Sequence, residues 1–146
     1  MKAVAIGDKM VGGDNPPYVV AEACVNHQGD FEHAKKMVEF AHAMGADAIK
    51  FQMHILEDEM LRDTPLSQNF DKSLWDTIAD TNFSTEQHAE LIKFCREVGI
   101  QYLCTPFSKK SADVLDELGV VAFKTGSGEL TNIPLMKHIG GKGKPM

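Results

Sequence analysis

The sequence predicts an α/β fold built from repeated strand and helix units, and three observations support this prediction. An amphipathic helical segment, a glycine and a short apolar segment follow one another three times along the 146-residue chain. Apolar residues recur every three or four positions in the helical segments and run almost without interruption in the short ones. Each short segment finishes in polar residues, at the end of the strand where α/β enzymes place their active sites.

Each helical segment begins at a residue suited to cap a helix and ends at a glycine. The first follows Asp30 and ends at Gly45, the second starts at Ser84 with Gln87 completing a capping box, and the third starts at Ser108. The predicted inward stripes are Phe31, Ala34, Val38, Ala41 and Met44, then Leu91, Ile92, Cys95 and Val98, then Ala112, Leu115 and Leu118. Strands are predicted to follow them at residues 46–52, 100–105 and 120–125.

The remaining segments complete the predicted order of elements. Residues 3–11 are compatible with a capping hairpin, and residues 18–23 form an apolar run that predicts a first buried strand. A fourth helix is expected with Pro134 in its first turn and its end at Gly140. Residues 54–83 are a polar insertion with a short helix around Trp75, and long insertions of this kind are usually functional.

The chain is short for a closed barrel. Its last residues, 144–146, resemble the entry into a fifth strand. An eight-stranded βα barrel needs about 250 residues, so this chain would supply about half of one. A complete small doubly wound sheet remains the alternative interpretation.

Composition and charge exclude several classes of protein. The chain is 43% hydrophobic and 25% charged, with a dispersed net charge of −6 and only short basic clusters, so we expect no nucleic-acid partner. It has no apolar run of membrane-spanning length and no signal-peptide pattern at residues 1–13, which predicts no membrane association and a cytoplasmic location. The odd number of cysteines, Cys24, Cys95 and Cys104, predicts reduced thiols that pack as small apolar side chains.

Polar side chains are expected to meet at the carboxyl ends of the strands. Because side chains alternate along a strand, Glu22, Lys50, Gln52, Thr105 and Lys124 should all point inward. Two lysines with one acid leave a positive surplus that suits an anionic substrate. The alternative is an internal ion pair of Glu22 with one lysine that only supports the fold.

A glycine-rich stretch follows the last of these strands. Residues 125–129 combine flexible backbone with the Ser127 hydroxyl and the Glu129 carboxylate, just before a predicted helix. Exposed backbone N–H groups at such a place bind phosphate or carboxylate well, although the same pattern also occurs in ordinary turns.

Five stretches carry a family resemblance. They are AEACVNHQG (21–29), GADAIKFQ (45–52), CTPFS (104–108), FKTGSGE (123–129) and GKPM (143–146). In this order they resemble the sialic acid synthases, also called N-acetylneuraminate synthases. The stretch HILEDEM (54–60) resembles bacterial synthases that act on unphosphorylated N-acetylmannosamine.

The resemblance implies a fold and a reaction. The fold is a (β/α)8 barrel of the TIM type, of which residues 1–146 would be the N-terminal portion of a single catalytic domain, without the second half-barrel and the C-terminal antifreeze-like domain. The reaction joins phosphoenolpyruvate to the open-chain aldehyde of N-acetylmannosamine, giving N-acetylneuraminate and phosphate. A divalent metal, manganese or magnesium, is implied for the full-length enzyme, which is expected to be a homodimer.

The resemblance also assigns residues. Four positions match those that hold phosphoenolpyruvate: Lys50, Thr105, Lys124 and Ser127. Two match positions that contact the sugar: Glu22 and Asn69. Glu129 matches a carboxylate near the metal-bound water, so Glu22 and Glu129 are the catalytic candidates.

No metal ligand is assigned to this chain. His27 and His54 lack the spacing of a ligand cluster, and in the family the metal-binding histidines belong to later strands of the barrel. We therefore expect His27 to shape the loop after the first strand. Without the metal ligands and the C-terminal domain, the 146-residue chain is expected to have no synthase activity alone.

Other functions stay open at this point. A Schiff-base aldolase would use Lys50 or Lys124 as its nucleophile, and a non-catalytic half-barrel would bind ligands without chemistry. Within the family, legionaminate synthases, sialic acid 9-phosphate synthases and spore-coat polysaccharide enzymes share the same stretches, so the sugar is not assigned.

Overall fold

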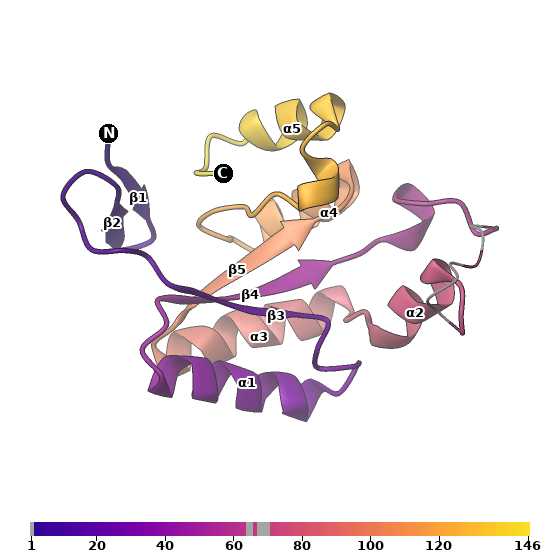
Figure 1. Cartoon of the computed structure of the whole chain (residues 1–146), viewed down its shortest axis with the longest axis horizontal. Coiled ribbons are helices and arrows are strands. Elements are labelled where there is room, and N and C mark those ends of the chain that lie inside the picture. Colours follow the sequence, from indigo (N-terminus) through magenta and orange to yellow (C-terminus); the bar gives the residue numbers. More distant parts are fainter. Residues whose placement is uncertain (1, 64–65, 67–70) are drawn as a thin grey trace.

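A parallel three-stranded sheet forms the centre of the structure. The computed structural model describes residues 2–63, 66 and 71–146. The strands β3 (Val20–Cys24), β4 (Ala48–Met53) and β5 (Gln101–Pro106) pair in this order. Helices α1 (Phe31–Ala43) and α3 (Thr85–Val98) lie side by side on one face of the sheet (Figure 1). The α/β prediction is therefore confirmed.

The predicted caps account for where the helices begin. Asp30 accepts a hydrogen bond from the backbone N–H of His33 at 2.9 Å, and Ser84 and Gln87 form the reciprocal capping box. Gly99 ends α3 in the left-handed region, with φ at 91°, which side chains other than glycine rarely adopt. The inward prediction for Met44 is wrong, because α1 ends at Ala43 and the Met44 side chain is 67% exposed.

Shorter helical elements complete the structure. The predicted helices are confirmed as α2 (Leu74–Thr81), α4 (Lys109–Glu117) and α5 (Ile133–Gly140), with the single 3-10 turns η1 (Leu56–Asp58) and η2 (Ser127–Glu129). Within the described part of the chain, no helix has the length and apolar character needed to cross a membrane.

The strand predicted at residues 120–125 does not form. Its segment makes one isolated parallel bridge, between Phe123 and Cys104, with Lys124 N–H donating to the Cys104 carbonyl at 3.2 Å. On its other side, the Phe123 N–H donates to the carbonyl of Pro145 at 2.9 Å. This is a single hydrogen bond to the residues near the C-terminus and does not amount to strand pairing. A ladder needs consecutive partners, and this segment has only single contacts.

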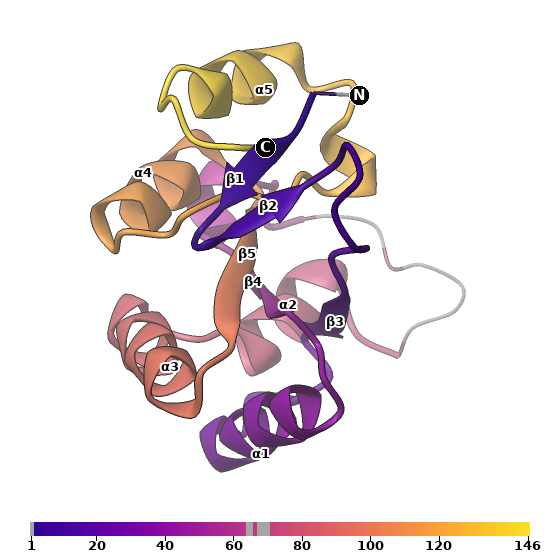
Figure 2. The same ribbon diagram turned by 90° about the vertical axis from the view of Figure 1, so that its left-hand side faces the viewer.

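The sheet separates two apolar clusters. Alternate side chains such as Phe51 and Tyr102 pack against the helices in the larger cluster, whereas Ala48, Leu103 and Ala122 form a small cluster on the opposite face. The hairpin of β1 (Val4–Ile6) and β2 (Lys9–Val11) lies over the second face, where Ile6 packs against the small cluster (Figure 2).

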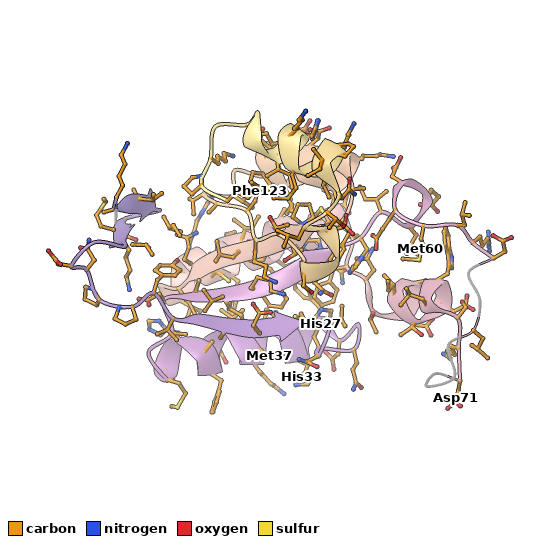
Figure 3. All side chains as sticks on the ribbon, turned by 45° about the horizontal axis from the view of Figure 1, so that its top comes forward. His27, His33, Met37, Met60, Asp71 and Phe123 are labelled. Atoms are coloured by element: carbon orange, nitrogen blue, oxygen red, sulfur yellow. The ribbon has the colours of Figure 1, made fainter. Side chains whose placement is uncertain are left out.

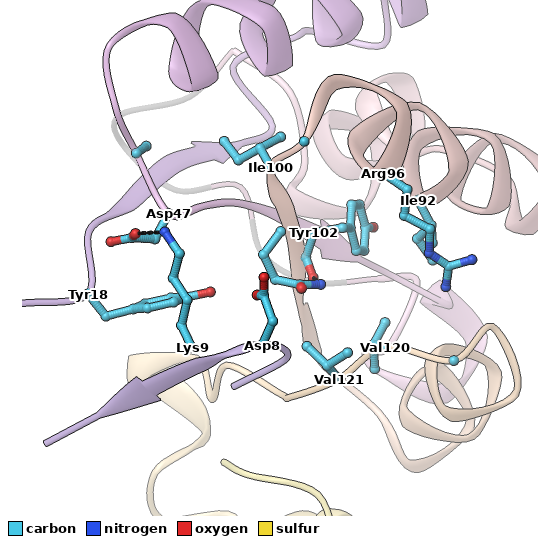
Figure 4. A pocket seen from close by; sticks show the side chains of 14 residues that line it. Asp8, Lys9, Tyr18, Asp47, Ile92, Arg96, Ile100, Tyr102, Val120 and Val121 are labelled. Atoms are coloured by element: carbon cyan, nitrogen blue, oxygen red, sulfur yellow. Dashed lines mark hydrogen bonds and ion pairs between the residues drawn. The ribbon is translucent and has the colours of Figure 1, made fainter. Parts of the chain in front are cut away.

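The amino ends of the strands carry a polar pocket of about 370 Å³ (Figure 4). Lys9 of the hairpin forms an ion pair there with Asp47, just before β4. The hydroxyl of Tyr18 is buried and has no hydrogen-bond partner among the described residues. Burial, followed by the charges of Asp47 and Asp8, raises the pKa of Tyr18 to about 12.

Candidate functional site

Lys50 is the centre of the opposite, carboxyl end of the sheet. It lies between Ile49 and Phe51, which pack with the helices, so its own side chain points to the other face, as the alternation predicts. Lys50 is only 1% exposed. Its Nζ lies 2.8 Å from Oε2 of Glu22, its register partner on β3, and 2.9 Å from Sγ of Cys24.

This contact keeps both partners charged. Burial opposes the charged form of Lys50, but its hydrogen bonds to Cys24 and Glu22 outweigh burial and raise its pKa. For Glu22, burial likewise favours the neutral acid, and the hydrogen bonds from Lys50 and Cys24 with the charges of Lys50 and Lys124 lower its pKa overall. The pair therefore stays ionised at this end of the sheet, and Lys124 adds a second positive charge that acts on Glu22.

Cys24 is a site residue that the sequence prediction missed. Cys95 and Cys104 are fully buried, and burial raises the pKa of each to about 12, which fits the predicted packing role. Cys24 instead donates toward Glu22 at 3.3 Å and lies at an irregularity in the β3–β4 pairing, with φ at 51°. No periodic pattern in the sequence distinguishes it, because the irregularity arises only when β3 pairs with β4.

Thr105 presents an unsatisfied hydroxyl beside this pair. It is 1% exposed, and its Oγ1 has no hydrogen-bond partner in the described part of the chain. Its register partner on β4 is Gln52, two positions beyond Lys50 on the same face. Since buried hydroxyls in native proteins nearly always have a partner, this atom indicates a ligand or a water at the carboxyl end of β5.

The glycine-rich segment packs next to Thr105. A Cβ at Gly126 would come within 3.5 Å of Cγ2 of Thr105, so the backbone of this segment approaches the strand end closely. Lys124 precedes it and is near enough to lower the pKa of Glu22. Ser127 is exposed at the start of η2.

Glu129 lies at the far end of the same segment. Its carboxylate accepts a hydrogen bond from Nδ2 of Asn132 at 2.7 Å, and it lines a pocket of about 520 Å³ together with Glu59 and Phe107. The structure thus joins Glu22 and Lys50 directly and brings Thr105, Lys124 and the Ser127–Glu129 segment to the same end of the sheet. Asn69 lies outside the described residues.

The two histidines have separate partners. His27 lies in the turn after β3 (Figure 3). It stacks on Phe83 with ring centroids 3.9 Å apart, and burial lowers its pKa to about 4. The ring of His54 stacks on Phe107, and its Nδ1 lies 2.9 Å from both carboxylate oxygens of Glu59. Glu59 was not predicted, and the His54–Glu59 spacing of five residues offers no helical or strand period that would have shown it.

The metal implied by the resemblance does not fit the residues at hand. In the described ranges, no three His, Cys, Asp or Glu side chains come together as a set that would hold an ion. The chemistry that this site offers is that of ammonium groups, hydroxyls and carboxylates, which suits the recognition of a phosphate or carboxylate.

Comparisons with known proteins identify the family of this chain. The model of the NeuB family matches residues 37–146. An uncharacterised protein of Methanocaldococcus jannaschii is 37% identical over 146 residues, which is 100% of this chain and 41% of that protein. Human N-acetylneuraminate-9-phosphate synthase is 35% identical over 143 residues, covering 94% of this chain and 40% of the human protein.

A solved structure shows the same fold. The N-acetylneuraminic acid synthetase of Leptospira borgpetersenii superposes with a TM-score of 0.85 at 27% identity, over 98% of this chain and 47% of that one. The chain thus spans about two fifths of the length of the curated relatives it matches. On the family match over residues 37–146 and these likenesses, the chain belongs to the NeuB family.

Proposed function

We propose that this chain supplies the phosphoenolpyruvate-binding part of a sialic acid synthase-type active site. The reaction is the condensation of phosphoenolpyruvate with N-acetylmannosamine to N-acetylneuraminate and phosphate. Membership of the NeuB family and the names of the matching synthases support this proposal. The single observation that carries it is the buried Lys50 ammonium on the same face of the sheet as the Thr105 hydroxyl, which has no hydrogen-bond partner among the described residues.

Each residue has a role in the proposed reaction. Lys50, Thr105, Lys124 and Ser127 bind the phosphate and carboxylate of phosphoenolpyruvate and stabilise its charge as the phosphate departs. C3 of the enol attacks the aldehyde carbon of the sugar, and water then adds at C2. Glu22 and Asn69 contact the sugar, and Glu129 positions or deprotonates the water.

The remaining parts of the enzyme are proposed to lie outside this chain. We propose that the ligands of the divalent ion, manganese or magnesium, belong to those remaining parts of the enzyme. We further propose that the three strands and the bridged segment are the first half of a (β/α)8 barrel, and that the full-length enzyme is a cytoplasmic homodimer. The two-fifths coverage of the relatives supports the first of these proposals.

The sugar is defined only as a class. Relatives of 33% and 26% identity are named as synthases of N,N'-diacetyllegionaminic acid and pseudaminic acid, so a related amino sugar is the alternative substrate. A Schiff-base aldolase is the less favoured chemistry, because the family model and the named relatives are those of synthases.

The deciding experiment compares the full-length product with its Lys50→Met variant. We expect metal-dependent phosphate release from phosphoenolpyruvate and N-acetylmannosamine in the first and none in the second, and no turnover by the 146-residue chain. A full-length product inert toward every such sugar, yet able to bind phosphoenolpyruvate, would support a binding module instead. Borohydride trapping of a pyruvate imine would support the aldolase.

A further inference from the structure

Cys24, Lys50 and Glu22 form a cluster of three chemically reactive side chains. Sγ of Cys24 lies 2.9 Å from Nζ of Lys50 and 3.3 Å from Oε2 of Glu22, while Nζ and Oε2 are 2.8 Å apart. A thiol, an amine and a carboxylate are thus in mutual contact at one point. Lys50 is almost fully buried, so its Nζ has little freedom to leave Sγ.

The surroundings favour oxidation of Cys24 over the other two cysteines. Its Sγ has a carboxylate and an amine in direct contact, which can accept and supply protons during a reaction with peroxide. Cys24 is partly exposed, whereas Cys95 and Cys104 are fully buried among apolar side chains. The chain therefore contains two internal controls for any reaction specific to Cys24.

We propose that Cys24 and Lys50 form a covalent sulfenamide cross-link when the protein meets hydrogen peroxide. In the first step the Cys24 thiol takes one OH group from peroxide and becomes a sulfenic acid, and the other OH group leaves as water with the thiol proton. In the second step the ammonium of Lys50 must first lose a proton; the freed amine then attacks Sγ, the S–O bond breaks, and the hydroxide leaves as water with a further proton from Nζ. The first of these two protons passes to the carboxylate of Glu22, and one hydrogen remains on the nitrogen of the S–N bond.

The cross-link would inactivate the anion site reversibly. It removes the positive charge of Lys50 and its ion pair with Glu22, so binding of phosphoenolpyruvate is lost. A thiol such as dithiothreitol attacks the sulfur and releases the Lys50 amine, with Cys24 recovered after a second thiol exchange. The loss of binding rests on the proposed function, whereas the cross-link itself does not.

The test uses mass spectrometry on the 146-residue chain. After hydrogen peroxide, we expect an intact mass lower by two hydrogen atoms, loss of tryptic cleavage after Lys50, and a peptide that joins Lys50 to Cys24. Dithiothreitol should reverse all three changes. Cys24→Ser should remain unlinked, Lys50→Met should stop at a sulfenic acid that dimedone traps, and Cys95→Ala should cross-link like the unmodified chain.

Two results would overturn the proposal. One is oxidation of Cys24 to sulfinic acid with Lys50 still cleavable, and the other is a thiol at Cys24 that survives peroxide while Cys95 or Cys104 is oxidised. Calorimetric titration with phosphoenolpyruvate before and after peroxide separates the two proposals. A cross-link in a chain that never bound phosphoenolpyruvate would refute the proposed function and leave the Cys24–Lys50 chemistry standing.

Discussion

The ammonium of Lys50 lies 2.8 Å from the carboxylate of Glu22, its register partner on the adjacent strand, but the two side chains differ in exposure. The Lys50 side chain is 2% exposed and that of Glu22 is 50% exposed. The Glu22 carboxylate therefore faces solvent, whereas the Lys50 ammonium is enclosed. An entering ligand can replace water at Glu22 without first having to desolvate Lys50.

Removal of the Lys50 charge is expected to weaken binding of phosphoenolpyruvate. A charge-assisted hydrogen bond contributes about 1.5–3 kcal/mol, so Lys50→Met should weaken affinity by about ten- to hundredfold in calorimetric titrations. Lys93→Met is the matched control, since Lys93 is 78% exposed in a surface pair with Glu97 and should bind as before. Equal affinity in the Lys50 and Lys93 variants would contradict the assigned role.

Acid is expected to destabilise the fold between about pH 6.5 and 4. Burial lowers the pKa of His27 from 6.5 to about 4 and that of His88 to about 3, so the unfolded chain takes up protons that the folded chain does not. The stabilisation is present above the unfolded pKa of 6.5 and is lost as the pH falls toward the folded values. For His27 the loss is on the order of 3 kcal/mol.

Urea titrations across this pH range measure the effect. His27→Asn retains an acceptor for the Gly29 N–H, which His27 Nδ1 accepts at 3.2 Å, and cannot be protonated. This variant should flatten the pH dependence. A slope as steep as that of the unmodified chain would show that other groups cause it.

Removal of the side-chain hydroxyl should affect the stability of the fold differently at the two tyrosines. The Tyr102 hydroxyl is 2.7 Å from Nδ1 of buried His88, so Tyr102→Phe should lower the free energy of unfolding by about 1–3 kcal/mol. The buried Tyr18 hydroxyl has no partner in the ranges that the structure covers, so Tyr18→Phe should leave stability unchanged or raise it. Chemical denaturation of both variants checks this, and a clear loss in Tyr18→Phe would indicate a bound water or ligand at that atom.

The His54–Glu59 contact is expected to hold the start of the insertion in place. Both side chains are at most 10% exposed, and the His54 backbone is also held by Asn82, which donates to its carbonyl at 2.7 Å. Glu59→Gln should cost about 1–3 kcal/mol of unfolding free energy and speed amide hydrogen exchange over residues 54–60. Asp58→Asn, which alters only an exposed pair with Lys110, is the control and should change neither quantity.

The chain is expected to self-associate along β3. In the described residues β3 pairs only with β4, and the apolar groove beside its other edge exposes Val19 (53%) and Phe40 (68%). Phe40→Lys should therefore shift the sedimentation profile toward monomer at high concentration. Lys36→Glu changes a charge on the same groove without removing an apolar side chain and serves as the control. The association hypothesis fails if the unmodified chain is already monomeric.

Local signals were strong enough for the sequence to determine the helices and their order by itself. Asp30, Ser84 and Ser108 cap helices through contacts within three residues, and Gly99 ends one by its own backbone freedom, so distant residues are not required. The inward position of Lys50 follows from strand alternation, which is equally local.

Tertiary structure alone decided the features that depend on pairing between distant segments. The contact of Cys24 with Lys50 exists because β3 pairs irregularly with β4. That the Thr105 hydroxyl has no partner in the described part of the chain depends on what β4 and the Gly126 segment place around it. The expected strand at 120–125 is reduced to a bridge because strand formation needs a ladder of consecutive partners, whereas Cys104 and Pro145 each supply a single hydrogen bond there. Local sequence specifies the helices because their hydrogen bonds close within four residues, whereas strands and sites are completed by residues far along the chain.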